Sequence, residues 1–300
     1  MTQSSVLDLT QLRRQLHRMA EPSGEERRTA QFVAESLQHI GVENLVQGVG
    51  GNGVLCSLSG QSPGPTVLLR ADLDALPLQD DDRLEHASER AGCAHRCGHD
   101  GHMAMVLGVA QSLRQEPPAR GRAVFLFQPA EETGQGAFDV LQDERFAPFA
   151  PDFALATHNL PGFELGTVVL RRGIFASASK GMCVEWIGRA SHASEPAAGR
   201  SPIPAATQFA QELERLPQSA TALEESAQIT VVGVVAGGAN YGINPGEARV
   251  MATLRAHTDS TMDKLTMRAQ ELARGLAAAH GLEIKVTWHE EFPATPCDDR

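Results

Sequence analysis

Short apolar runs that alternate with helical patterns constrain the fold of this chain more than any other feature of its sequence. Runs such as "GVLCSLSG" at 53–60 and "RAVFLFQ" at 122–128 lie between glycine or proline residues, as buried strands do. Residues 100–115 instead place Met103, Leu107 and other apolar side chains on one stripe of a helix. The alternation predicts an α/β fold in which helices cover a mostly parallel sheet.

The two ends of this first part carry further local signals. Residues 7–41 read as two amphipathic helices separated by "EPSGEE" at 21–26, where Ser23 and Glu26 form a capping signal. Asp100 is the expected N-cap of the helix at 100–115. The apolar run "GTVVLRR" at 166–172 is expected to be another strand.

A second pattern begins at about residue 176. Strands and helices follow there in the order βαββαβ, which is that of a ferredoxin-like domain. The sequence therefore predicts a first domain at 1–175 and a separate domain at 176–288, followed by a short segment at 289–300.

Composition narrows the class of partner and the compartment. The 300 residues carry 26 Lys and Arg against 37 Asp and Glu, a formal net charge of −11, without a run of basic residues. This balance disfavours binding to nucleic acid or to an anionic membrane, so the expected partner is a small molecule. Five cysteines without a repeating spacing disfavour a secreted disulfide framework, and the start "MTQSSVLDLT" does not read as a signal peptide, so we expect a cytoplasmic location.

The segment "CAHRCGHDGH" at 93–102 concentrates metal-ligating side chains just before a helix. Polar residues also follow three apolar strands, in "RADLDALP", "QPAEE" and "THNLPG". Because open α/β sheets bind ligands at the carboxyl ends of their strands, we expect these segments to converge on one crevice. The candidate residues are Cys97, His99, Asp72, Asp74, Glu131, Glu132 and His158.

Two other interpretations of the cluster compete with an open metal site. A closed structural zinc site would need a second close pair of ligands, and Cys93 and Cys97 offer only CxxxC spacing. A cysteine nucleophile activated by His95 or His99 is chemically reasonable, but it leaves the adjacent carboxylates of Glu131 and Glu132 without a task. Adjacent carboxylates suit a metal hydrolase, in which one binds the ion and the other carries protons.

Several motifs together resemble one known family. The segments "LHRMAEPSGEERRTA", "RADLDALPLQ", "HRCGHDGHMAM", "FLFQPAEETGQGA", "THNLPGFELGTV" and "GRASHASEP" are similar, in this order, to motifs of the aminoacylase and carboxypeptidase family of dinuclear metallohydrolases. The branch they resemble most contains hippurate hydrolases and auxin-conjugate hydrolases. The resemblance runs from about residue 11 to about residue 297.

The resemblance implies a role for each candidate. Cys97 would bridge two metals through its thiolate, His99 and His158 would complete one metal, and Glu132 would bind the other. Glu131 would be the general base and acid. Asp72 would orient a ligand imidazole, and Arg70 stands where related peptidases carry a ligand histidine.

The resemblance implies that residues 1–175 are a catalytic domain and that residues 176–288 are an inserted lid that also forms a homodimer. Residues 289–300 would then begin the return to the catalytic domain. His192 is similar to the lid histidine that reaches a partner's active site and stabilises an oxyanion, and Arg255 is similar to an arginine near the substrate carboxylate. Where relatives usually read "NVIP", this chain reads "YGINPGEA", so Asn240 or Asn244 would have to replace the usual asparagine.

The function implied is metal-dependent hydrolysis of the amide bond of N-acyl amino acids or small peptide-like substrates, with zinc or manganese. Relatives continue for roughly a further quarter of their length, and that part supplies a last histidine to the second metal. A chain without it is expected to hold only one metal tightly. The alternative function is therefore a catalytically impaired or silent homologue that binds one metal and ligand without efficient turnover.

Overall fold

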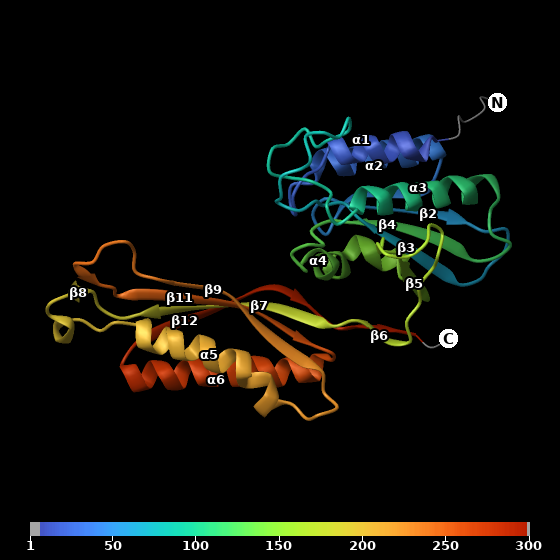
Figure 1. Ribbon diagram of the computed structural model, residues 1–300. Helices are drawn as coiled ribbons and strands as arrows, with labels where there is room; N and C mark the ends of the chain where they lie inside the picture. The colour runs from blue at the N-terminus through green and yellow to red at the C-terminus, as the bar shows by residue number, and fades with distance from the viewer. Residues whose placement is uncertain (1–6, 299–300) are drawn as a thin grey trace. The chain divides into compact units, whose positions relative to one another are not determined.

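The computed structural model describes residues 7–298, which divide into two compact units at Thr167 and Val168. The first unit is built on a five-stranded sheet (Figure 1). Its strands, in spatial order, are β1 (Glu43–Val49), β2 (Gly53–Ser59), β4 (Arg122–Gln128), β3 (Thr66–Asp72) and β5 (Phe153–Ala156). Strands β4, β3 and β5 run parallel, whereas β1 and β2 add an antiparallel edge. The mixed α/β class is confirmed, and its parallel part holds the strand ends expected to carry the chemistry.

Helices cover both faces of this sheet. On one face lie α1 (Leu9–Arg18), α2 (Arg27–Ile40) and α3 (His99–Gln115), and on the other lie α4 (Gly136–Gln142) and the short 3₁₀ helix η1 (Glu144–Phe149) (Figure 1). The sequence explains this, because successive side chains of β4 point to opposite faces of the sheet. Phe125 and Phe127 pack in the hydrophobic core on one face, and Val124 and Leu126 pack in the core on the other. A strand buried on both faces is rigid, and its end is a fixed platform for functional side chains.

The second unit contains the element order βαββαβ, in β7 (Ala178–Ile187), α5 (Ile203–Ala220), β9 (Ala227–Ala236), β11 (Glu247–Ala256), α6 (Asp259–His280) and β12 (Glu283–Phe292). The strands form an antiparallel sheet in the order β12-β7-β11-β9. Helices α5 and α6 pack on one face of it around Trp186, Phe209 and Leu265 (Figure 1). Shorter elements are β6 (Gly173–Ala176), β8 (Ser191–His192), η2 (Pro196–Ala198), β10 (Ile243–Asn244) and β13 (Thr295–Cys297).

The unit boundary and three local features differ from the sequence-based expectation. The boundary at 167 and 168 precedes the predicted residue 175, and β12 continues to Phe292, past the predicted limit of 288. Residues 166–172 do not form a strand. Helix α3 begins at His99 after Gly98 and is not capped by Asp100, and α2 has no side-chain cap at Glu26. Ser23, Glu26 and Asp100 instead bond to distant parts of the first unit.

Within residues 7–298, none of the helices is both long enough and apolar enough to span a membrane.

Candidate metal centre

The first unit gathers the predicted residues at the carboxyl ends of its parallel strands. Asp72 ends β3 and lies opposite Gln128, which ends β4, so the segments after these two strands start side by side. Glu131 and Glu132 follow β4, His158 follows β5, and Cys97 lies two residues before the start of α3. Four segments far apart in the sequence thus supply one site.

Among residues 7–298, three groups of side chains lie close enough to hold a metal ion. Within each group the ligating atoms lie within 4.8 Å of one another. The groups are Cys97, His99 and His158; His99, Glu131 and Glu132; and Asp72, His99 and His102. His99 belongs to all three and is therefore the centre of the cluster.

The orientation of the His99 ring fits a metal ligand. Its Nδ1 atom lies 2.8 Å from the backbone carbonyl oxygen of Asp74, so the ring nitrogen that donates is Nδ1 and the lone pair is on Nε2. This Nε2 atom is buried without a hydrogen-bond partner, 3.6 Å from Glu132 Oε1 and 3.7 Å from Glu131 Oε2. Glu132 Oε1 is also buried without a partner. Buried polar atoms are normally paired, so two such atoms facing each other fit a site for a cation.

Cys97 and His158 form the exposed side of the site. Their Sγ and Nε2 atoms are 3.3 Å apart, and His158 Nδ1 lies 2.8 Å from the backbone oxygen of Asn159. The hydrogen bonds with His158 and, second, with His99 lower the pKa of the Cys97 thiol. A thiolate is the form of cysteine that binds metals, so this environment also fits a metal site.

The pKa values of the two glutamates differ from those of exposed carboxyl groups. Burial raises the pKa of both Glu131 and Glu132. The nearby carboxylate of Asp72 raises the pKa of Glu131 further, and Glu131 in turn raises that of Glu132. Clustered carboxylates of this kind are stabilised by a cation placed between them. The residues present therefore fit a divalent ion.

The structure pairs Asp72 with a histidine that sequence reasoning did not assign. Asp72 Oδ1 lies 2.8 Å from His102 Nδ1, whereas its Oδ2 is 3.9 Å from His99 Nε2. His102 Nε2 accepts from the backbone N–H of Asn159 at 3.1 Å, which joins α3 to the segment after β5. The spacing of His99 and His102 by three residues would have indicated a shared helix face if α3 had been expected to begin at His99.

Gly98 allows this close packing before α3. Its φ is +91°, and a Cβ atom at this position would lie 2.4 Å from Asn159 Oδ1. A side chain would therefore be strained by the backbone and would displace the partner of His102.

The competing interpretations of the cysteine cluster receive little support. Cys93 is buried against Ala20 and Ala75 and is in none of the three metal-compatible groups found within residues 7–298. His95 is buried and neither of its ring nitrogens has a hydrogen-bond partner, whereas Cys97 lies beside His158 and His99, which are both metal-compatible ligands. The structure thus offers neither a CxxxC clip nor a Cys97–His95 pair.

The second unit holds the other predicted residues. His192 is exposed on β8, and its Nδ1 lies 2.7 Å from Ser194 Oγ. Asn244, on the paired strand β10, donates to Ser191 Oγ at 3.2 Å. Arg255 is exposed on β11.

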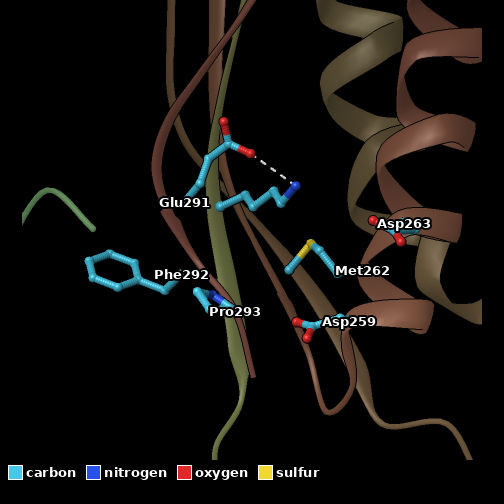
Figure 2. A pocket seen from close by; sticks show the side chains of 7 residues that line it. Asp259, Met262, Asp263, Glu291, Phe292 and Pro293 are labelled. Carbon is cyan, nitrogen blue, oxygen red and sulfur yellow. Dashed lines mark ion pairs between the residues drawn. The ribbon is translucent and has the colours of Figure 1, made fainter. Parts of the chain in front are cut away.

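A cavity of about 240 Å³ also lies in this unit, between the start of α6 and the end of β12 (Figure 2). Lys180 pairs there with Glu291 at 2.9 Å. None of its lining residues belongs to the metal-compatible groups found in the described residues, so the candidate chemistry lies in the first unit.

Comparison with known proteins identifies the family. Residues 68–300 match the model of the family that is described as "Peptidase family M20/M25/M40". The chain belongs to this family. It is 33% identical over 289 residues to N-acetyl-L-cysteine deacetylase of Bacillus subtilis (strain 168), a match that covers 96% of this chain and 68% of the relative. It is 29% identical over 277 residues to N-acetyldiaminopimelate deacetylase of Anoxybacillus flavithermus, covering 92% and 73%.

Solved structures of similar proteins agree with the family assignment. The YXEP protein of Bacillus subtilis, a dinuclear metal binding peptidase from the M20 family, superposes with a TM-score of 0.76 at 28% identity, covering 97% of this chain and 75% of that one. The aminobenzoyl-glutamate utilization protein from Klebsiella pneumoniae gives 0.73 at 25% identity, covering 97% and 77%. The resemblance drawn from the motifs is therefore confirmed, as is membership of a family of hydrolytic enzymes. The metal binding named for the YXEP protein agrees with the metal-compatible cluster in the first unit.

Proposed function

We propose that this chain hydrolyses the amide bond of N-acyl amino acids, with water as the nucleophile and divalent metal at the carboxyl ends of β3, β4 and β5. The observation that carries the proposal is the pair of buried, unpartnered atoms His99 Nε2 and Glu132 Oε1 beside Cys97 and His158. Relatives that are named deacetylases of N-acetyl-L-cysteine and N-acetyldiaminopimelate support an N-acyl amino acid as the substrate class.

Four side chains would hold the metal. The Cys97 thiolate would be shared between two ions, His99 and His158 would complete one of them, and Glu132 would bind the other. Divalent ions at this place would supply Lewis acidity, lowering the pKa of water and polarising the amide carbonyl. Thiolate and imidazole ligands favour zinc, while carboxylates also accept manganese.

Glu131 would transfer the proton. It takes a proton from water as the water oxygen adds to the carbonyl carbon, and it gives that proton to the leaving nitrogen as the C–N bond breaks. The products are a carboxylic acid and a free amino acid. Burial raises the pKa of Glu131, which makes its carboxylate a stronger base than an exposed one.

The second unit would act as a lid and as the contact between two copies. His192 would stabilise the oxyanion in the partner's site, and Arg255 would bind the substrate carboxylate, with Asn240 or Asn244 as a further polar contact. The exposed positions of His192 and Arg255 on their strands support this proposal. The five free cysteines support the expected cytoplasmic location.

A second candidate function follows from the sharing of His99. The groups that contain Cys97 and Glu132 both include His99, so two ions would compete for few ligands among residues 7–298. A chain that holds one ion tightly would bind ligand with little turnover.

One experiment separates the two functions. Metal content per chain is measured by mass spectrometry after dialysis, and hydrolysis of N-acetyl and N-benzoyl amino acids is followed on the same sample. Two ions with turnover support the amidohydrolase, and one ion with little turnover supports the second candidate. Protein without metal and without activity would contradict both.

A further inference from the structure

The side chain of Glu26 serves a distant part of the first unit. Glu26 directly precedes α2, yet its side chain makes no capping hydrogen bond to this helix. The start of α2 is instead held by Glu21, whose carboxylate accepts from the Thr29 N–H and hydroxyl at 2.9 Å each and from the Arg28 N–H at 3.3 Å. The Glu26 carboxylate is fully buried and needs another explanation.

One of its three hydrogen-bond partners lies at the turn that carries the two glutamates of the candidate site. Glu26 Oε1 accepts from the Ala130 N–H at 2.8 Å and from the Gly24 N–H at 2.7 Å, while Oε2 accepts from Asn52 Nδ2 at 2.8 Å. All three partners are donors, so the carboxylate satisfies each of them. The bond to Ala130 joins residues 104 positions apart, immediately before Glu131.

Ala130 itself requires such support. Its φ is +49°, in the left-handed region that a residue with a Cβ atom adopts at a cost of about 1 kcal/mol or more. Ala130 lies between the end of β4 and the turn at 131–134, so its conformation sets the direction in which Glu131 and Glu132 leave the strand. A strained residue persists only when its surroundings fix it, and the Glu26 carboxylate is the side chain that binds its amide.

A second backbone amide of the turn, that of Glu132, is held by Asp74. The Glu132 N–H donates to Asp74 Oδ2 at 2.9 Å, and the same oxygen accepts from the Ser23 hydroxyl at 2.6 Å. The segment 21–26 thus contacts the turn directly through Glu26 and indirectly through Ser23 and Asp74. The polar side chains of this segment and Asp74 thereby hold the backbone of the turn that carries Glu131 and Glu132.

We propose that Glu26 is a positioning residue for the Glu131 and Glu132 pair, which it aims by clamping the left-handed Ala130 amide. The inference rests on the proposed function, because it takes Glu131 as the proton carrier and Glu132 as a metal ligand. Residues that orient metal ligands in this indirect way typically change metal affinity or activity by about 10- to 100-fold when removed.

The test compares Glu26→Ala with Glu21→Ala in the full chain. Both variants remove a buried carboxylate with three hydrogen bonds from the same segment, but only Glu26 touches the turn at 129–136. We expect hydrogen exchange in a peptide covering this turn to accelerate at least about tenfold in Glu26→Ala and to stay unchanged in Glu21→Ala. We also expect Glu26→Ala to weaken binding of the second equivalent of Co²⁺ about 10- to 100-fold and to lower kcat more than it raises KM.

Two further variants keep the test decisive. Glu26→Gln retains an oxygen for the Ala130 and Gly24 amides, so the turn should stay closer to wild type than in Glu26→Ala, although the new NH₂ group faces the Asn52 NH₂ group, which also donates to the Gly24 oxygen. If Glu26→Ala does not fold, Glu26→Asp retracts the carboxylate from Ala130 and should show the same changes to a smaller degree. Equal exchange, metal binding and kinetics in the Glu26 and Glu21 variants would overturn the inference. A wild-type chain that binds no Co²⁺ would instead contradict the proposed function, and faster exchange of the turn would then still uphold the clamp.

Discussion

At the residue scale, the single hydrogen bond from His99 Nδ1 to the Asp74 carbonyl decides which ring atom faces the site. Because Nδ1 is engaged in this bond, the free ring nitrogen Nε2 lies beside Glu131 and Glu132. On the exposed side of the site, Cys97 Sγ lies close to His158 Nε2. An imidazole fixed in this way needs no reorganisation to bind an ion. Substitutions of single residues in the site are therefore expected to act through the charge of the side chain and through the atom that it offers to a metal ion or a proton.

Cys97→Ser is expected to lose metal at one position or at both. A serine hydroxyl stays protonated near neutral pH, so it cannot replace a thiolate that is shared between ions. Metal content after dialysis checks this, with Cys93→Ser as the control because Cys93 lies outside the metal-compatible groups. Wild-type metal content in Cys97→Ser would remove this residue from the site.

Glu131→Gln and Glu132→Gln are expected to fail in different ways. Glu131→Gln should keep its metal and lose about 10² to 10⁴ in kcat, the usual contribution of a positioned acid or base. Glu132→Gln should lower metal occupancy, since an amide is a weaker ligand than a carboxylate. Kinetics and metal analysis on the same preparations distinguish them, and the reverse pattern would exchange the two roles.

His17 gives the first unit a pH-dependent contribution to stability. Its Nδ1 lies 2.9 Å from Asp100 Oδ2 and its Nε2 lies 3.1 Å from Asp80 Oδ2, so both nitrogens donate only when the ring is protonated. The hydrogen bond to Asp100 raises the pKa of His17 against the opposing effect of burial. Other charged or titratable groups around the cluster are Arg13, Arg14, Arg18, His86, His95 and Arg96.

His17→Gln is therefore expected to lower the free energy of unfolding by about 3 kcal/mol at pH 6, as when one partner of a buried ion pair is removed. Because the pKa of His17 is raised on folding, this stabilisation is complete below the unfolded value of about 6.5 and is lost as the pH rises through the folded value. Urea unfolding from pH 6 to pH 9 measures the difference. His39→Gln, on the exposed end of α2, should be close to neutral, and a constant difference across the range would contradict the protonated pair.

At the element scale, the start of α3 depends on one glycine. We expect Gly98→Ala to cost about 2–4 kcal/mol, the sum of left-handed backbone strain and a clash with the Asn159 side chain. Gly92→Ala is a matched control, because Gly92 has a φ of +72° and nothing lies within 4 Å of its added Cβ atom. It should cost only about 1 kcal/mol. Equal losses in chemical denaturation would show that the Asn159 contact does not matter.

Helices and strands with a clear pattern of apolar residues could be predicted from the sequence, and so could the end of the sheet at which the candidate residues gather. The strands that became β2 and β4 read clearly as apolar runs, and the strand ends correctly located the cluster around His99. The apolar run at 166–172 read the same way but forms no strand, since apolar composition alone does not distinguish strands from other segments.

The long-range polar contacts were beyond what local pattern shows. Ser23 and Glu26 fit a helix-capping signal, yet their side chains bond to Asp74 and Ala130. Asp100 fit an N-cap and instead binds His17. A polar side chain near a helix start has several possible partners, and only the tertiary structure brings the distant ones within reach.

At the scale of the whole molecule, the edge strand β9 is the expected contact between two copies. Val232 and Val235 are 64% and 56% exposed on it, and an uncovered apolar edge pairs readily with another strand. Val232→Lys should raise the dissociation constant of a dimer at least about tenfold, because a charge on an edge opposes pairing. Sedimentation equilibrium measures this against Met267→Lys, an exposed position on α6, and a wild-type monomer at micromolar concentration would exclude the dimer.

Strands β6 and β13 are antiparallel neighbours, with Gly173 directly opposite Cys297. The segment 173–297 therefore starts and finishes at one point, which is the geometry that lets a domain be inserted into a loop of another protein without stretching it. A segment of this kind can be exchanged between related proteins as one unit. Its surface can diverge or be replaced by that of a relative, while the sheet that holds His99 keeps its own strand order.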